Sequence, residues 1–245
     1  MPAGVRAALE PDLTLVEMRQ GDVVFEPEAA VECAFFPVTG VLSALTLLQD
    51  GSAVETATVG REGAVGLSSA LTTTRSHGRV IAQTPATVFR VKDAVLRTLA
   101  AESAPLRELI VAYADLMLAQ AQQSTACNIS HDVEERFCRW LLTCDDRVRG
   151  ARVELTQEFL AMMLGVQRTT VSQVASQIQA AGLIRYNRGR IDILDRPELE
   201  RRSCECYDAI RRRTRAFLPL PASGLTPTTR EESAELAEPQ AGDQP

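Results

Sequence analysis

Short apolar runs separated by turn residues fill the N-terminal part of the chain. The runs are VVF at 23–25, AFF at 34–36, VLSALTLL at 41–48, AVETATV at 53–59, RVIAQ at 79–83 and TVFRV at 87–91. The pair Asp50-Gly51 lies between two of these runs, and Asp-Gly in that setting is a strong β-hairpin signal. Many short strands at regular spacing predict a sandwich, roll or barrel.

The period of the apolar residues then changes from that of a strand to that of a helix. No glycine occurs from Ala104 to Cys127, and Pro105 stands where the first turn of a helix tolerates proline. Apolar residues recur there in two neighbouring rows. One row would be enough to pack the helix against the β domain. The second row favours a helix from another subunit, and the alternative is one helix buried within its own chain. The expected dimerisation residues are Leu106, Leu109, Ile110, Tyr113, Leu116 and Met117.

The segment LTQEFLAMMLGVQRTTVSQVASQIQAAGLIRYNRGRIDIL, residues 155–194, predicts two short helices and a hairpin. Thr156 can cap the first helix, and Gly165 supplies the turn to a second helix that runs from near Gln167 to Ala181. The runs IRYN and RIDIL flank a turn at Gly189 and form a wing. This order is typical of a winged helix-turn-helix domain.

Polar residues gather at the N-terminal end of the second helix, which in this architecture faces the edges of the bases. Arg168 can donate two hydrogen bonds to guanine, and Gln173 can pair with adenine. Arginines on the wing suit the phosphate backbone. The expected DNA-binding residues are Gln167, Arg168, Thr169, Thr170, Ser172, Gln173, Arg188 and Arg190.

Charge is distributed unevenly along the chain. The formal net charge is −6, yet residues 151–215 carry 12 basic and 8 acidic side chains. A basic segment within an acidic chain indicates a local surface for a polyanion. Hydrophobic residues make up 45% of the sequence, which is enough for a folded core. Because no long apolar run and no signal-peptide pattern occurs, we expect a cytoplasmic protein without a membrane partner.

The chain offers little for metal binding or catalysis. It has six cysteines and two histidines, and no Cys-x-x-Cys pair occurs. We therefore expect free thiols and no metal site, with a redox role for Cys204 and Cys206 as the alternative. A cupin-type metal enzyme would need two or three histidines in the roll, where only His77 occurs. Nucleophile-elbow, P-loop and H-E-x-x-H motifs are absent from the sequence, so we expect no enzyme.

The motifs just described resemble the Crp/Fnr family of bacterial transcription regulators. The helix-turn-helix segment is close to that family's pattern, and so are Asp132 and Arg136 before it. The stretches GDVVFEPEAAVECAFFPVTGVLS and DGSAVETATVGREGAVGL resemble the family's effector roll. The resemblance implies an α+β protein that binds a two-fold symmetric operator in double-stranded DNA as a homodimer. RNA polymerase is a further candidate partner.

The resemblance also implies a division of the chain. Residues 1–103 would form a cyclic-nucleotide-binding-like β-roll that senses an effector, and 104–129 the dimerisation helix. Residues 130–218 would form the winged helix-turn-helix domain with a helical extension predicted at about 197–217. Residues 219–245, rich in Pro, Ser and Glu, would be a disordered tail. The remaining alternative is a ligand-binding regulator that acts through protein contacts without DNA.

Two departures from the cyclic-AMP-responsive members stand out. Their recognition helix reads Arg-Glu-x-x-x-Arg, where this chain has Arg168, Thr169 and Gln173, so the operator should differ. Their effector pocket has Gly-Glu and then Arg-Ser. Here Leu67 replaces the carboxylate. Arg75 and Arg79 align about equally well with the family's phosphate-binding arginine. The candidate effector residues are therefore Gly66, Leu67, Arg75, Ser76 and Arg79.

The effector itself is not identified by the sequence. Cyclic AMP is disfavoured because the carboxylate for its ribose is missing. An iron–sulfur cluster is disfavoured because the N-terminal cysteine cluster of the oxygen-sensing branch is absent. Haem is disfavoured because His77, the one candidate axial ligand, lies in a loop-like stretch.

Overall fold

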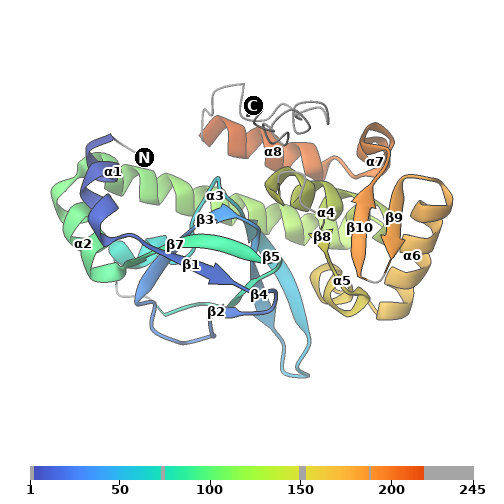
Figure 1. Ribbon diagram of the computed structural model, residues 1–245, viewed down its shortest axis with the longest axis horizontal. Coiled ribbons are helices and arrows are strands. Elements are labelled where there is room, and N and C mark those ends of the chain that lie inside the picture. The colour runs from blue at the N-terminus through green and yellow to red at the C-terminus, as the bar shows by residue number, and fades with distance from the viewer. Residues whose placement is uncertain (1–2, 73–74, 149–152, 188, 218–245) are drawn as a thin grey trace, which may run out of the picture.

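The computed structural model describes residues 3–72, 75–148, 153–187 and 189–217. Its elements form a β-roll, a long central helix and a C-terminal helical domain with a small sheet (Figure 1). The α+β fold expected from the sequence is therefore confirmed. The expected tail at 219–245 and the wing residue Arg188 lie outside the described residues.

The roll consists of two antiparallel sheets. One has the order β1-β7-β3, with β1 at Thr14–Met18, β7 at Ala86–Lys92 and β3 at Cys33–Thr39. The other has the order β2-β6-β4-β5, with bounds Val23–Phe25, Arg79–Ala82, Leu42–Leu47 and Ala53–Val59. The expected hairpin at Asp50-Gly51 joins β4 to β5, and Gly51 adopts a φ of 84° that favours glycine. Helices α1 (Ala3–Leu9) and α2 (Asp93–Glu102) lie beside the roll, with the short 3-10 helices η1 (Glu10–Asp12) and η2 (Leu67–Ala70).

The central helix α3 spans Ala104–Ser130. The Ser103 hydroxyl caps it by accepting a hydrogen bond from the Leu106 amide, and Pro105 occupies its first turn. The helix runs along the whole length of the roll and reaches the C-terminal domain (Figure 1).

The face of α3 expected to dimerise proves to be largely the face that packs on its own chain. Leu106 and Ile110 are 0% and 1% exposed, and Tyr113 is buried with them in one core cluster. These three residues are covered within their own chain, as the alternative interpretation of the helix expected, and a role for them in dimerisation stays a prediction. Leu116 and Met117 pack against the same cluster and, like Leu109, stay half-buried.

The C-terminal domain begins with α4 (Val133–Val148) and continues with β8 (Val153–Glu154), α5 (Gln157–Leu164) and α6 (Arg168–Ala180). Strands β9 (Ile184–Asn187) and β10 (Arg190–Ile193) complete the sheet β8-β10-β9. The single helix expected at 197–217 is instead two helices, α7 (Arg196–Arg202) and α8 (Cys206–Phe217). The break allows α8 to turn back and pack along α3.

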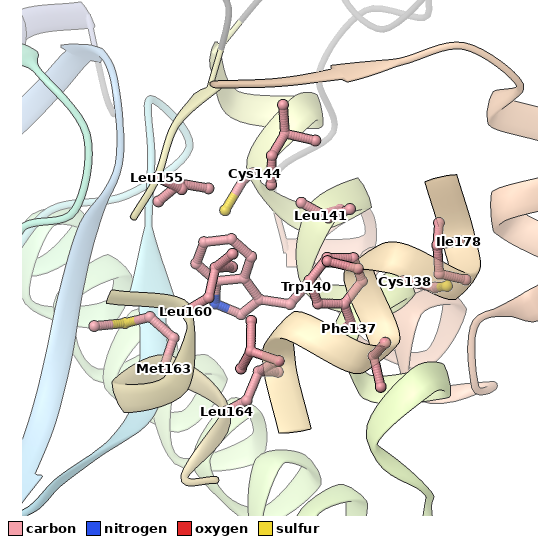
Figure 2. Packing of buried hydrophobic residues seen from close by; sticks show 14 of the residues in the cluster. Phe137, Cys138, Trp140, Leu141, Cys144, Leu155, Leu160, Met163, Leu164 and Ile178 are labelled. Atoms are coloured by element: carbon pink, nitrogen blue, oxygen red, sulfur yellow. The ribbon is translucent and has the colours of Figure 1, made fainter. Parts of the chain in front are cut away.

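The largest core cluster surrounds Trp140 of α4, whose side chain is fully buried (Figure 2). Leu160, Met163 and Leu164 of α5 pack around the same cluster. Leu45 and Ile81 of the roll also belong to it. The roll and the C-terminal domain therefore share a continuous core rather than meeting at a polar boundary.

A buried carboxylate adds a polar link across this boundary. Glu55 of β5 accepts hydrogen bonds from Trp140 Nε1 at 3.1 Å, from Ser43 Oγ at 2.7 Å and from Gln83 Nε2 at 3.1 Å. Burial raises the pKa of Glu55 to about 7, although the Ser43 hydrogen bond and the charge of Arg139 oppose the rise. The three donors satisfy a group whose burial would otherwise be costly.

The motif VGREGAVG at 59–66 lies at the junction of the roll, α3 and α4. A Cβ atom at Gly60 would lie 2.7 Å from the Arg147 side chain, and one at Gly63 would lie 2.2 Å from the Tyr113 hydroxyl. Arg147 also pairs with Glu62 at 2.7 Å. The glycines are required by close packing, and the motif connects the effector roll to both helices that lead to the C-terminal domain.

None of the helices in the described part of the chain is both long enough and apolar enough to cross a membrane.

Candidate DNA-binding site

Helices α5 and α6 form the expected helix-turn-helix. The Thr156 hydroxyl caps α5 by accepting from the Phe159 amide at 3.2 Å. Gly165 ends α5 in the left-handed conformation with a φ of 63°, which reverses the chain toward α6. Val171 and Ile178 of α6 are fully buried in the core. These contacts fix which side of α6 faces outward.

The N-terminal end of α6 exposes most of the side chains expected there. Gln167, Arg168, Thr169 and Gln173 are exposed, while Thr170 and Ser172 are half-buried. Thr169 and Gln173 are four residues apart and therefore share one face of the helix. The exposed surface carries hydrogen-bond donors and acceptors with no bulky apolar group between them.

Arg168 is held in place by the first helix of the motif. Its Nη1 lies 3.0 Å from Glu158 Oε1, and its Nε lies 3.4 Å from Gln157 Oε1. Gln157 also donates to Ser172 Oγ at 3.2 Å. Both partners of the ion pair are more than 60% exposed, so the pair is weak and Arg168 can exchange Glu158 for another acceptor. Sequence reasoning missed Glu158 because the pairing depends on how the two helices cross.

The wing follows α6 directly. Gly189 turns between β9 and β10 with a φ of 78°, and Arg190 is exposed at the start of β10. Tyr186 of β9 donates from its hydroxyl to the Leu155 carbonyl at 2.9 Å, which ties the wing to the segment before α5. The Tyr186 amide also donates to Gln179 Oε1 of α6 at 2.6 Å, so the wing is bonded both to α6 and to the segment before α5.

The expected effector residues differ in burial and in their partners. Leu67 is buried in the core beneath α2, and Gly66 packs against the Cys33 carbonyl and the Phe25 ring. Arg79 pairs with Glu26 at 2.9 Å. Arg75 is exposed and donates to the Glu28 carbonyl, and Ser76 donates to the Gly78 carbonyl.

A cluster of potential metal ligands was missed by reasoning from Cys-x-x-Cys spacing alone. Cys127, His131, Cys204 and Cys206 bring one ligand atom each to within 4.8 Å of one another. The expectation that the spacing offers no set of four ligands is therefore wrong. The available signal was the i, i+4 spacing of Cys127 and His131 near a helix end, together with a Cys-x-Cys pair.

Comparisons with known proteins agree with this architecture. A family model described as a cyclic nucleotide-binding domain matches residues 15–103, and one described as a Crp-like helix-turn-helix domain matches residues 135–202. Curated protein sequences gave no match.

Several solved structures have the same fold, and this chain aligns with nearly the full length of each. FixK2 from Bradyrhizobium japonicum is 22% identical, with a TM-score of 0.66 over 78% of this chain and 98% of that chain. The c-di-GMP responsive regulator CLP from Xanthomonas campestris is 16% identical, with a TM-score of 0.61 over 78% and 99%. TTHA1359, a CRP/FNR family transcriptional regulator from Thermus thermophilus, is 19% identical, with a TM-score of 0.63 over 78% and 98%.

The two family matches occur in the order that the structure shows, joined by the long helix α3. The exposed polar end of α6 lies where a helix-turn-helix protein meets DNA. The chain therefore belongs to the Crp/Fnr family of DNA-binding transcription regulators.

Proposed function

We propose that the protein binds a two-fold symmetric DNA site as a homodimer and reads its bases with the N-terminal end of α6. The observation that carries this proposal is the exposed row of polar side chains at that end, beside the ion pair of Arg168 and Glu158. In the major groove, Arg168 exchanges Glu158 for guanine O6 and N7, and Gln173 pairs with adenine. Arg190 of the wing contacts the phosphate backbone.

The second subunit is proposed to pack on the outer face of α3. Val111, Leu118 and Ile129 are 60%, 57% and 82% exposed, although large apolar side chains are usually covered. They follow one another at intervals of seven and eleven residues, so they lie on one side of the helix, turned away from Leu106 and Ile110. Seven-residue spacing suits the seam of a two-helix coiled coil.

We propose that the protein does not bind cyclic AMP in the pocket that the cyclic-AMP-responsive members use. Leu67 is buried where the ribose would need a carboxylate, and Arg79 is already paired with Glu26. Titration calorimetry of the full-length protein with cyclic AMP should therefore give no binding heat. Saturable binding in the micromolar range would contradict this inference.

The DNA-reading role is tested by the variant Arg168→Ala in a gel-shift titration on the operator. Loss of a bidentate contact to a base should weaken binding by about 1–3 kcal/mol, or roughly 5- to 150-fold. Arg90→Ala is the matched control, because Arg90 is an exposed arginine on β7 of the roll. It should leave affinity within about twofold. Equal losses in both variants, or none in Arg168→Ala, would refute the role of Arg168.

A further inference from the structure

Four side chains far apart in the sequence converge where α3 leads into the C-terminal domain. Cys127 belongs to the last turn of α3, and His131 follows that helix as its C-terminal cap. Cys204 comes from the link between α7 and α8, and Cys206 is the first residue of α8. The three cysteines are buried in one cluster, and each of them is a free thiol.

The distances within this cluster fit a mononuclear site. In a tetrahedral zinc centre with Zn–S bonds of about 2.3 Å and a Zn–N bond of about 2.0 Å, neighbouring ligand atoms are about 3.5–3.8 Å apart. Cys127 Sγ lies 3.5 Å from Cys204 Sγ, and Cys206 Sγ lies 3.6 Å from His131 Nδ1. All four ligand atoms lie within 4.8 Å of one another. A small closure of the longer separations would bring every ligand to bonding distance.

The surroundings of the histidine also match those of a metal ligand. His131 turns Nδ1 toward Cys206, while its Nε2 lies 3.0 Å from the Glu205 carboxylate. Metal-bound histidines commonly donate their second ring N–H to a carboxylate, which orients the ring and strengthens the ligand. Gln123 Nε2 lies 3.0 Å from Cys206 Sγ and can donate to a thiolate there. A purely apolar packing of cysteines would need neither partner.

Positive charge is available to balance such a centre. Zinc bound by three thiolates and a neutral histidine carries one net negative charge. Arg136 and Arg139 of α4 are buried, and both interact electrostatically with Cys127. Within the described part of the chain, their Nε atoms have no hydrogen-bond partner. Burying a guanidinium is costly unless a nearby negative charge compensates it.

We propose that Cys127, His131, Cys204 and Cys206 bind one zinc ion, which crosslinks α8 to the junction of α3 and α4. Three thiolates and an imidazole are soft and borderline ligands of the kind that zinc takes in closed structural sites. With four protein ligands, the ion has no open position for catalysis. Binding deprotonates the thiols, so zinc affinity rises with pH.

The location indicates what the ion does for the protein. Cys127 and His131 flank the point where the chain leaves α3 for the DNA-binding domain, and Cys206 begins the helix that packs back on α3. The ion thus joins the central helix, the junction and the C-terminal extension. Its removal should loosen α8 and lower the thermal midpoint of the full-length protein.

Elemental analysis of the full-length protein, purified under reducing conditions without added chelator, tests the proposal. The expected result is about one zinc per chain, with zinc lost in Cys204→Ser and retained in the control Cys33→Ser, whose cysteine lies on β3 outside the cluster. Cobalt added to the metal-free protein should give the visible bands of tetrahedral thiolate coordination, and zinc should displace them.

A milder variant keeps the test decisive if Cys204→Ser fails to fold. The Glu205 side chain is 77% exposed, so Glu205→Gln should fold normally and lower zinc affinity roughly 10- to 100-fold through His131. Absence of metal from the wild type together with no cobalt spectrum would overturn the proposal. So would stoichiometric iron and sulfide, or a disulfide between Cys127 and Cys204 found under reducing conditions.

Discussion

Arg168 and Glu158 show how single residues prepare the DNA-binding surface. The carboxylate holds the guanidinium at the end of α6 at 3.0 Å, on a surface open to solvent. Because the pair is exposed and weak, it restrains the Arg168 side chain only slightly before DNA is bound. If Arg168 binds guanine as proposed, it must first leave this carboxylate, so Glu158 would compete with DNA. The proposed role of Glu158 is therefore to set the affinity without contacting a base.

Glu55 is a second single residue with a large effect, because its carboxyl group is buried where the roll packs against α4. Its pKa is about 7 in the folded protein against 4.5 for the free side chain. The folded state thus binds the proton more tightly, and Glu55 makes the protein less stable as pH rises from about 4.5 to about 7. Above that range its contribution is constant.

The variant Glu55→Gln should remove this pH dependence. Wild-type protein should lose up to about 3 kcal/mol of unfolding free energy between pH 4.5 and pH 7 relative to the variant. Urea titrations at several pH values measure this difference. The control is Glu17→Gln, because Glu17 is exposed on β1 and its replacement should leave the wild-type pH profile. Parallel profiles for wild type and Glu55→Gln would show that Glu55 does not titrate in this range.

At the level of elements, α3 illustrates what a sequence pattern can and cannot predict. The apolar pattern correctly predicted a helix, and Leu106 and Ile110 pack in one core cluster with residues of the roll and α2. The exposed face contains only a few large apolar residues, Val111, Leu118 and Ile129, separated by small and polar ones. Periodicity therefore pointed to the face with more apolar residues, although the contact between two helices of a dimer needs only a narrow row of apolar residues.

The helix-turn-helix was predicted more accurately than α3. Thr156 and Gly165 fix the ends of α5 through local geometry, and local geometry can be read from neighbouring residues. The break between α7 and α8 was missed; it lies where Cys204 contacts Cys127, a residue far away in the sequence. The metal-ligand cluster was missed for the same reason. Local spacing indicates each half of the cluster, but it does not show that the two halves, 77 positions apart, come together.

The proposed dimer seam on the outer face of α3 predicts the behaviour of a charged variant. Leu118→Glu places two carboxylates in a desolvated contact and should convert the dimer to a monomer at micromolar concentration, as measured by sedimentation velocity. Leu48→Glu serves as the control, because Leu48 is 52% exposed beside the β4–β5 hairpin and lies away from α3. A Leu118→Glu variant that still sediments as a dimer would place the subunit interface elsewhere.

Across the whole molecule, the roll and the DNA-binding domain are connected at several points. Glu55 bonds to Trp140, Glu62 pairs with Arg147, and Leu45 of the roll enters the core around Trp140. A change in the roll can therefore alter the position of α4, and with it the position of α6. Cooperative contacts of this kind are what an effector domain needs in order to act on DNA binding.

Dimer geometry then determines the form of the DNA site. Two copies of α6 related by a two-fold axis should enter successive major grooves about 34–36 Å apart. The operator should accordingly consist of inverted half-sites whose centres are about one helical turn apart. Because Thr169 and Gln173 replace the acid and the second arginine of cyclic-AMP-responsive members, the half-site should differ from theirs.

Base reading by α6 in a symmetric dimer can be measured by selecting bound duplexes from a random-sequence pool with the full-length protein. The expected result is enrichment of an inverted repeat with that spacing. Failure to enrich any sequence at low ionic strength, or enrichment of a single asymmetric half-site, would show that α6 does not read bases in a symmetric dimer.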